Sequence, residues 1–387
     1  MISFEERVGS VVNEDTVDDL LRKVYCILGM PVDAIAMPSV LRSIQKAVAS
    51  KVAFLISTPN LNFLVNCESD PGFRESLLFS DLCPVDGMPI LWIAWLLGIP
   101  IKNRVAGSDI FDALKCKSYS ARPLKVFLFG GAEGIAAAAS RALNTEATGL
   151  YCVGSLCPGF GTVDEMSRCD IMDKVNASEA DFLAVSLGAK KGQSWLRHNH
   201  HRLLIPVRVH LGASINFQAG TVKRAPCIMQ KIGLEWLWRI KEEPYLWRRY
   251  WNDLVVLLRL LFVRVLPLAI LTRWLRLKCK RYRRDLVITQ THGSESVTVS
   301  LSGSAIAQHV DKIIPVFREA IATKKRIIID FYHTRLVDTR FLGLLLMLRK
   351  KLTVSGVSLI FIGLSPGLER IFRLNGLGFL LSGDKRV

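Results

Sequence analysis

The chain of 387 residues lacks the paired cysteines of a secreted or zinc-binding protein. Its nine cysteines are scattered singly, and no two of them form a CxxC pair. Disulfide frameworks use an even number of cysteines, and structural zinc sites use CxxC spacings, so we expect reduced thiols, a cytoplasmic chain and no metal site. The N-terminal stretch MISFEERVGSVVNEDTVDDLL is acidic and has no apolar core. We therefore expect no secretory signal.

Signatures of nucleic-acid binding are also missing: the sequence has no zinc finger, RNP or helix-turn-helix motif, although its net charge is +17. The positive charge is local, because the net charge is +1 over residues 1–246, +10 over 247–284 and +6 over 285–387. Each Lys or Arg near an anionic leaflet contributes on the order of 1 kcal/mol to binding. This distribution favours an anionic membrane surface as partner and argues against nucleic acid.

A long uninterrupted hydrophobic run is lacking too. Only residues 254–271 approach one, and Arg259, Arg264 and Pro267 interrupt them. Eighteen helical residues reach about 27 Å, less than the ~30 Å of a bilayer core. We expect an interfacial helix, or a shallow hairpin kinked at Pro267, with the two arginines reaching the lipid headgroups. Residues 252–284 are thus expected to form a membrane-associating segment, peripheral or monotopic.

Aromatic and cationic side chains gather just before this segment. Residues 224–251, RAPCIMQKIGLEWLWRIKEEPYLWRRYW, contain four tryptophans and several arginines. Tryptophan prefers sites with one wet and one apolar side, and guanidinium groups bind phosphate in a bidentate way. The segment suits a lipid headgroup or a diphosphate, and the alternative is a surface helix whose aromatic side chains fill a groove of the core.

Short apolar runs alternate with helical stretches between residues 26 and 251, which predicts an α/β domain with a largely parallel, Rossmann-like sheet. The expected strands are VAFLIST, KVFLFG, DFLAVSLG and IPVRVHLGAS, and the helices between them include LNFLVNCES, AEGIAAAASRAL and QSWLRHNH. Ligands of such sheets bind at the carboxyl ends of the strands. Residues 1–25 form an N-terminal extension, and a second, small α/β domain is expected over residues 285–387.

Two local motifs could carry chemistry. Gly130, Gly131 and Gly134 lie between a predicted strand and an Ala-rich helix, where backbone N–H groups can approach a phosphate; a tight turn without a ligand explains them equally well. Asp86 follows Pro84 and precedes an apolar helix. Its carboxylate could act as a general base or could simply cap that helix.

Eight ordered blocks resemble the WecG/TagA/CpsF glycosyltransferases. They are TPNLNFL, the DG at 86–87, RVAGSD, FGGAEG, LGAKKGQSWL, AGTVKRAP, GLEWLWRI and EPYLWRRY, spread over residues 26–251. The resemblance implies a UDP-sugar donor, with no cofactor, and a lipid-diphosphate-linked acceptor in bacterial polysaccharide biosynthesis. It also implies a location at the cytoplasmic face of the inner membrane.

The resemblance assigns roles to individual residues. Asp86 becomes the base that deprotonates the acceptor hydroxyl. The implied substrate-binding residues are Thr58, Asn60, Arg104, Asp109 and Gln193, together with Arg224, Arg239, Arg248 and Arg249 of a C-terminal lid, residues 224–251. The alternative for each arginine is a solvated helix face. The chain departs from the family's G-x-P-K-Q-E block, because Lys190 replaces the proline and the acidic residue is absent.

The same resemblance implies a metal-independent, inverting transfer by one direct displacement. No DxD-type carboxylate pair is evident in the sequence. Arginines and helix N-termini would then stabilise the charge on the departing diphosphate.

The C-terminal residues resemble a STAS domain, in which a D-S pair opens a helix and the serine can be phosphorylated. Asp338 and Thr339 stand at those positions, near Arg335 and Arg340. The resemblance implies phosphorylation of Thr339 or docking of a protein partner, and the alternative is that Asp338 or Thr339 only caps the helix. For the whole chain, the alternative to an enzyme is a non-catalytic membrane scaffold that binds a nucleotide or glycolipid.

Overall fold

A parallel five-stranded sheet forms the centre of the N-terminal half in this computed structural model, which describes residues 18–116, 122–212, 214–280 and 285–381. The strand order is β3–β7–β6–β4–β5. The strands are β3 (Phe54–Ile56), β4 (Leu124–Gly130), β5 (Leu150–Leu156), β6 (Phe182–Ser186) and β7 (Val207–His210). The predicted α/β fold is confirmed, and the sheet has one strand more than the sequence indicated, the edge strand β5.

Helices cover both faces of this sheet because its central strands are apolar on both sides. One face packs against α1 (Met37–Ser50), α5 (Gly107–Lys115) and α6 (Ile135–Glu146). The other face packs against α7 (Cys169–Ala177) and α8 (Ala189–His198). The sheet is therefore a three-layer, doubly wound structure.

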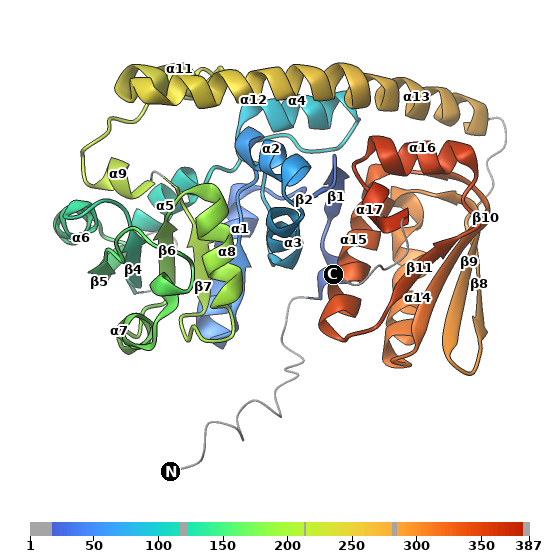
Figure 1. Ribbon diagram of the computed structural model, residues 1–387, viewed down its shortest axis with the longest axis horizontal. Helices are drawn as coiled ribbons and strands as arrows, with labels where there is room; N and C mark the ends of the chain where they lie inside the picture. The colour runs from blue at the N-terminus through green and yellow to red at the C-terminus, as the bar shows by residue number, and fades with distance from the viewer. Residues whose placement is uncertain (1–17, 117–121, 213, 281–284, 382–387) are drawn as a thin grey trace, which may run out of the picture.

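A second group of elements connects the two halves of the chain. It contains the antiparallel hairpin of β1 (Val24–Ile27) and β2 (Met30–Asp33), and the helices α2 (Leu61–Ser69), α3 (Pro71–Phe79) and α4 (Met88–Leu96). Their apolar side chains belong to the same hydrophobic core as those of the C-terminal domain. Figure 1 shows this group between the two sheets.

A long helical segment lies across both halves (Figure 1). It begins with the short α10 (Cys227–Lys231) and α11 (Glu235–Glu242), and continues through α12 (Trp247–Leu260), one π-helical stretch (Leu261–Val265) and α13 (Leu266–Lys280). By length and composition, Pro244–Leu275 is the one helix of the described residues that could cross a membrane, and 28% of its most apolar window is buried.

Of the two alternatives for this segment, the hairpin at Pro267 is wrong, because the helix continues through this residue. Pro267 is the second residue of α13, directly after the π-helical stretch, where the Leu266 N–H donates to the Leu261 carbonyl. The wider π turn relieves the clash of the proline ring with the preceding turn. Arg264 also differs from the expectation, since its guanidinium pairs with Glu68 at 2.7 Å and does not point to solvent as Arg259 does.

The C-terminal domain is a four-stranded sheet in the order β11–β10–β9–β8, with helices against it. The strands are β8 (Val287–His292), β9 (Ser296–Ala305), β10 (Arg326–Val337) and β11 (Leu359–Ile362); the helices are α14 (Val310–Ala322), α15 (Thr339–Val354), α16 (Pro366–Leu374) and α17 (Gly378–Leu381). The predicted small α/β unit is present, and the edge strand β8 was not foreseen.

Helix α15 is buried almost all round because its outer side packs against β1. The helix has no room for a side chain at Gly343, where a Cβ would lie 2.2 Å from the Val24 carbonyl oxygen. Arg340 donates to the same carbonyl at 3.0 Å. A helix with apolar residues on every side must be covered on every side, and the hairpin supplies the missing cover.

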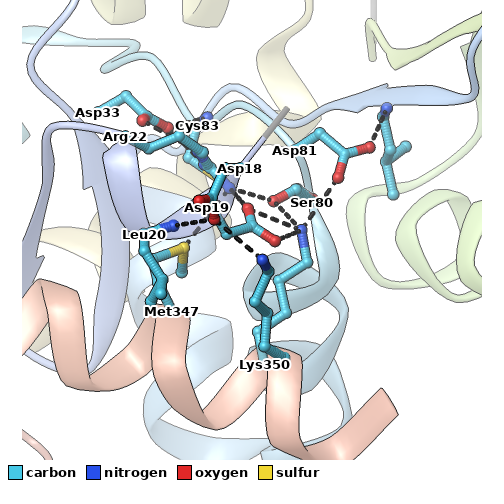
Figure 2. A network of polar contacts seen from close by, with 12 residues as sticks. Asp18, Asp19, Leu20, Arg22, Asp33, Ser80, Asp81, Cys83, Met347 and Lys350 are labelled. Carbon is cyan, nitrogen blue, oxygen red and sulfur yellow. Dashed lines mark hydrogen bonds and ion pairs between the residues drawn. The ribbon is translucent and has the colours of Figure 1, made fainter. Parts of the chain in front are cut away.

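Buried ion pairs surround this contact (Figure 2). The Lys350 ammonium lies 3.0 Å from both Asp19 and Asp81, and it donates to the Ser80 carbonyl. Arg22 pairs with Asp19 at 2.6 Å and with Asp33 at 2.7 Å. Removing one partner of a buried pair leaves an uncompensated charge, which typically costs about 3–5 kcal/mol. Of these pairs, those of Lys350 join α15 to the N-terminal half of the chain.

Candidate active site

Asp86 lies in the loop before α4, at a position fixed by the backbone. Its N–H donates to the Pro59 carbonyl at 2.9 Å, and its carboxylate accepts the N–H of Gly107 at the start of α5. The N-cap of α4 is Gly87, at φ 93°, and the cap makes no side-chain hydrogen bond. The capping alternative for Asp86 is therefore wrong, and its carboxylate faces α5 instead.

Burial raises the pKa of the Asp86 carboxyl to about 7. Arg104 opposes the shift, whereas the negative charges of Glu235 and Asp109 reinforce it, and the Gly107 N–H lowers the pKa slightly. Desolvation raises the pKa of a buried carboxyl unless a nearby cation offsets the effect. Because other carboxylates share Arg104, its charge offsets the desolvation of Asp86 only in part, and the pKa stays raised. A carboxyl with a pKa near 7 matches the requirement for a general base at neutral pH.

Charged side chains from three segments surround Asp86. Arg104 donates to Glu235 at 2.9 Å and lies 3.7 Å from Asp109. Arg224, at the start of the predicted lid, pairs with Asp109 and donates to Ser108 at 3.0 Å. We call these five residues the Asp86 cluster: Asp86, Arg104, Asp109, Arg224 and Glu235.

Thr58 and Asn60 lie beside the cluster, in the loop after β3. Thr58 is buried, and a Cβ added to Gly107 would lie 3.3 Å from its hydroxyl oxygen. Asn60 is half-buried and caps α2, since its side chain accepts the Phe63 N–H at 3.1 Å. Asn60 thus has a structural role in addition to the predicted contact with substrate.

Gly130 ends β4 and Gly131 follows it; packing against β6 accounts for Gly130, and the positive φ accounts for Gly131. A Cβ on Gly130 would lie 2.5 Å from the Ser186 carbonyl oxygen, and both glycines have positive φ, 101° and 83°. The Gly131 N–H donates to that carbonyl at 2.9 Å. These contacts favour the tight-turn alternative, and a phosphate contact of this loop stays a prediction.

Gln193 is fully buried in α8, beneath the loop that carries Thr58. Its side-chain oxygen accepts from Ser57 at 3.0 Å. Its amide nitrogen has no hydrogen-bond partner among the described residues. A role of Gln193 near the donor stays a prediction.

The remaining predicted arginines have partners of their own. Arg239 pairs with Glu243 and lies over Phe217, with its guanidinium carbon 5.1 Å from the ring centroid. Arg248 and Arg249 are exposed near the start of α12, over Trp247 and Tyr250. These contacts do not join the three guanidinium groups to the Asp86 cluster.

Thr339 is half-buried and is the first residue of α15. Asp338 caps the helix, since its carboxylate accepts the Phe341 N–H at 2.9 Å. Arg335 is exposed, while Arg340 is buried at the contact with Val24. The structure supports the capping alternative for Asp338 and leaves phosphorylation of Thr339 as a prediction.

Sequence reasoning missed Glu235, which brings a charge from α11 into the cluster. The signal was present in GLEWLWRI, where one acidic residue opens a helix rich in tryptophan. An acidic residue at the start of a helix ordinarily stabilises the helix through its dipole. The contact of Glu235 with Arg104 therefore becomes visible only in the folded chain.

Comparison with known proteins places these residues in a family. The profile of the glycosyl transferase WecG/TagA/CpsF family matches residues 25–269, and that of the Mlab, STAS domain matches residues 288–382. The structure of the Bacillus cell fate determinant SpoIIAA in the phosphorylated form is similar at 22% identity, covering 26% of this chain and 93% of that one with a TM-score of 0.22.

Several bacterial enzymes named N-acetylglucosaminyldiphosphoundecaprenol N-acetyl-beta-D-mannosaminyltransferase are similar to this chain. The protein of Bacillus spizizenii is 28% identical over 52% of this chain and 75% of its own length. The proteins of Bacillus subtilis and Staphylococcus aureus are each 24% identical, over 52% and 55% of this chain and 77% and 82% of their own lengths. The chain belongs to the WecG/TagA/CpsF family of glycosyltransferases and carries a C-terminal STAS domain.

Proposed function

We propose that this chain is an inverting, metal-independent glycosyltransferase that moves a sugar from a UDP-sugar to a polyprenyl-diphosphate-linked acceptor. The acceptor hydroxyl oxygen attacks the anomeric carbon, and the bond from that carbon to UDP breaks. Asp86 takes the hydroxyl proton, and UDP leaves with the bonding electrons. One base is enough for this single displacement.

The observation that carries the proposal is the buried Asp86 carboxyl with a pKa of about 7. Strongly shifted carboxyls surrounded by specific charges are typical of active sites. The names of the relatives give the acceptor class, because each contains diphosphoundecaprenol. Arg248 and Arg249 are the exposed cations that we assign to the leaving diphosphate.

The test is a transfer assay with a panel of UDP-sugars, including UDP-N-acetylmannosamine, and N-acetylglucosaminyl-diphosphoundecaprenol as acceptor. We expect wild-type activity and a loss of roughly 10²–10⁴-fold in Asp86→Asn. The matched control is Asp164→Asn, because the Asp164 side chain is 87% exposed, and it should keep wild-type activity. Binding of UDP without transfer to any acceptor would support the non-catalytic scaffold instead.

We also propose that the outer side of α12 and α13 binds the anionic cytoplasmic face of the inner membrane. Large apolar side chains recur there at helical spacing and are 40–69% exposed: Trp251, Leu254, Val255, Leu258, Phe262, Val263, Ile270, Trp274 and Leu277. We call this set the apolar stripe. Arg259 and Arg273 are exposed on the same helix and can pair with lipid phosphates. A lipid-linked acceptor then meets the enzyme at the membrane surface.

Thr339 remains our proposed phosphorylation site, with a protein partner of the STAS domain as the second proposed role. A phosphate there would place about −2 charges at the start of α15. Arg340 is the nearest cation in sequence, and it holds the Val24 carbonyl at 3.0 Å. Phosphorylation is thus expected to act through the contact between α15 and β1.

A further inference from the structure

The first residue of the lid helix α11 extends into the Asp86 cluster. Glu235 accepts from Arg104 at 2.9 Å, and the two side chains are 23% and 16% exposed. The next residues, Trp236 and Leu237, are 42% and 47% exposed. The helix therefore directs its carboxylate inward and apolar side chains outward.

Arg104 is the cation whose charge acts on Asp86, and it is shared with two other carboxylates. The charged groups that act on Asp86 are Arg104, Glu235 and Asp109, with the Gly107 N–H as the polar contact. Arg224 is already paired with Asp109 and with Asp112. Of the two carboxylates that compete with Asp86 for the Arg104 guanidinium, Glu235 is thus the closer, at 2.9 Å against 3.7 Å for Asp109.

Withdrawing Glu235 would change two things at Asp86. A negative charge would leave its surroundings, and Arg104 would be free to form a close ion pair with it. Both changes favour the ionised carboxylate. An ion-paired carboxylate of low basicity removes a proton from a hydroxyl less effectively.

We propose that Glu235 is a positioning residue of the lid, which holds Arg104 away from Asp86 so that the Asp86 carboxylate stays available for the acceptor hydroxyl. The inference rests on the proposed role of Asp86 as base. Helix α11 thus connects the lid to the base, because it lies before the apolar stripe in the chain and also places a carboxylate near Asp86. A lid displaced from the site would leave Asp86 paired with Arg104.

The first test compares pH profiles of the full-length enzyme with UDP-N-acetylmannosamine and N-acetylglucosaminyl-diphosphoundecaprenol in anionic vesicles. In Glu235→Gln we expect the acid limb of kcat/KM to move to lower pH, and kcat at pH 8 to fall roughly tenfold, with KM for the donor nearly unchanged. Glu235→Asp keeps the charge and should retain most of the wild-type profile. Glu242→Gln is the control on the same helix, since Glu242 contacts the Lys223 N–H. An acid limb of Glu235→Gln that superimposes on that of the wild type would overturn the inference.

The second test needs no activity and separates this inference from the proposed function. The stability difference between Asp86→Asn and the wild type, followed by thermal unfolding from pH 4 to 9, reports the titration of Asp86 in the folded protein. Repeating the pair in the Glu235→Gln background should shift that titration to lower pH. An unshifted titration rejects the role of Glu235 even in an active enzyme, and a shifted titration supports it even when no transfer is found.

Discussion

At the residue scale, the surroundings of Asp86 make an ordinary carboxyl basic. Burial raises the pKa of its carboxyl to about 7, and Arg104, the cation that opposes this shift, also pairs with Glu235 and Asp109. Burial together with a shared cation therefore allows Asp86 to accept a proton at neutral pH.

The pH dependence of the reaction follows from this pKa. The base must be ionised, so kcat/KM is expected to rise with pH through an acid limb centred near 7 and to level off above it. Steady-state rates from pH 5 to 9 check the prediction. A flat profile across pH 6 to 8 would contradict it.

The free energy of unfolding should titrate with the same carboxyl, but it should fall with rising pH where the activity rises. A carboxyl whose pKa is raised by folding binds a proton in the folded state first, so wild-type stability falls as pH rises from about 4 to about 7. Asp86→Asn lacks this loss and should be more stable than the wild type at pH 8 by roughly 1–3 kcal/mol. Urea unfolding at pH 5 and pH 8 measures the difference, and equal stabilities at both values would argue against a raised pKa.

Metal removal is a further test at the residue scale. If arginines stabilise the leaving diphosphate, excess EDTA should change the transfer rate by less than about twofold, because catalytic metals contribute several kcal/mol. The rate is measured before and after dialysis against EDTA. A large loss that Mg²⁺ or Mn²⁺ restores would replace the arginine mechanism.

At the scale of elements, the long helix has two different sides. Its inner side packs on the body through Leu257, Leu260 and Val265, while the apolar stripe lies outside. Monomeric soluble proteins seldom leave so many large apolar side chains exposed together. The helix is therefore suited to lie along a membrane surface. One of its arginines, Arg264, instead forms an ion pair with Glu68.

A charge placed on the apolar stripe should weaken vesicle binding. In Phe262→Glu, a side chain that is 68% exposed becomes anionic, and we expect binding to anionic vesicles to fall roughly tenfold or more. Val354→Glu is the control, because Val354 is 72% exposed at the end of α15. Co-sedimentation measures both, and equal binding of the two variants would remove the helix from the membrane interface.

Which elements the sequence could predict depends on how apolar they are. Runs such as KVFLFG and DFLAVSLG identified the buried strands β4 and β6, since strands covered on both faces are continuously apolar. The edge strands β5 and β8 escaped because small or polar residues interrupt their apolar runs: Gly154 and Ser155 in β5, and Thr289, Gln290 and Thr291 in β8.

The same contrast holds for the candidate site. Motif resemblance singled out Asp86, Arg104, Asp109 and Arg224, which the structure brings together. Glu235 could not be predicted, because its contact with Arg104 joins residues 131 positions apart. The need for glycine at 130 likewise comes from the carbonyl of a neighbouring strand.

At the scale of the whole molecule, the STAS domain and the glycosyltransferase domain share one hydrophobic core. The contact of α15 with β1 is close enough to exclude a side chain at Gly343, and buried ion pairs surround it (Figure 2). A partner of the STAS domain would therefore meet its remaining surfaces, or would have to displace the hairpin.

Two glycine substitutions test this docking. Gly343→Ala places a Cβ 2.2 Å from the Val24 carbonyl oxygen and should lower the free energy of unfolding by about 1–3 kcal/mol or more. A Cβ at Gly367, in α16, would lie 4.0 Å from the Ser365 hydroxyl oxygen, so Gly367→Ala should be neutral or stabilising by up to about 1 kcal/mol. Denaturant unfolding compares the two, and equal effects would mean that α15 is not docked on β1.

The burial of α15 on every side also determines whether the two domains can be separated, or the STAS domain transferred to another protein. A protein cut between the two sequence families would expose Val24 and Cys26 on one piece and the outer side of α15 on the other, so each piece is expected to aggregate. Moving this STAS domain onto another family member would require moving the β1–β2 hairpin with it. The unit that can be exchanged between proteins is thus the domain together with its hairpin, although the hairpin lies at the opposite end of the sequence.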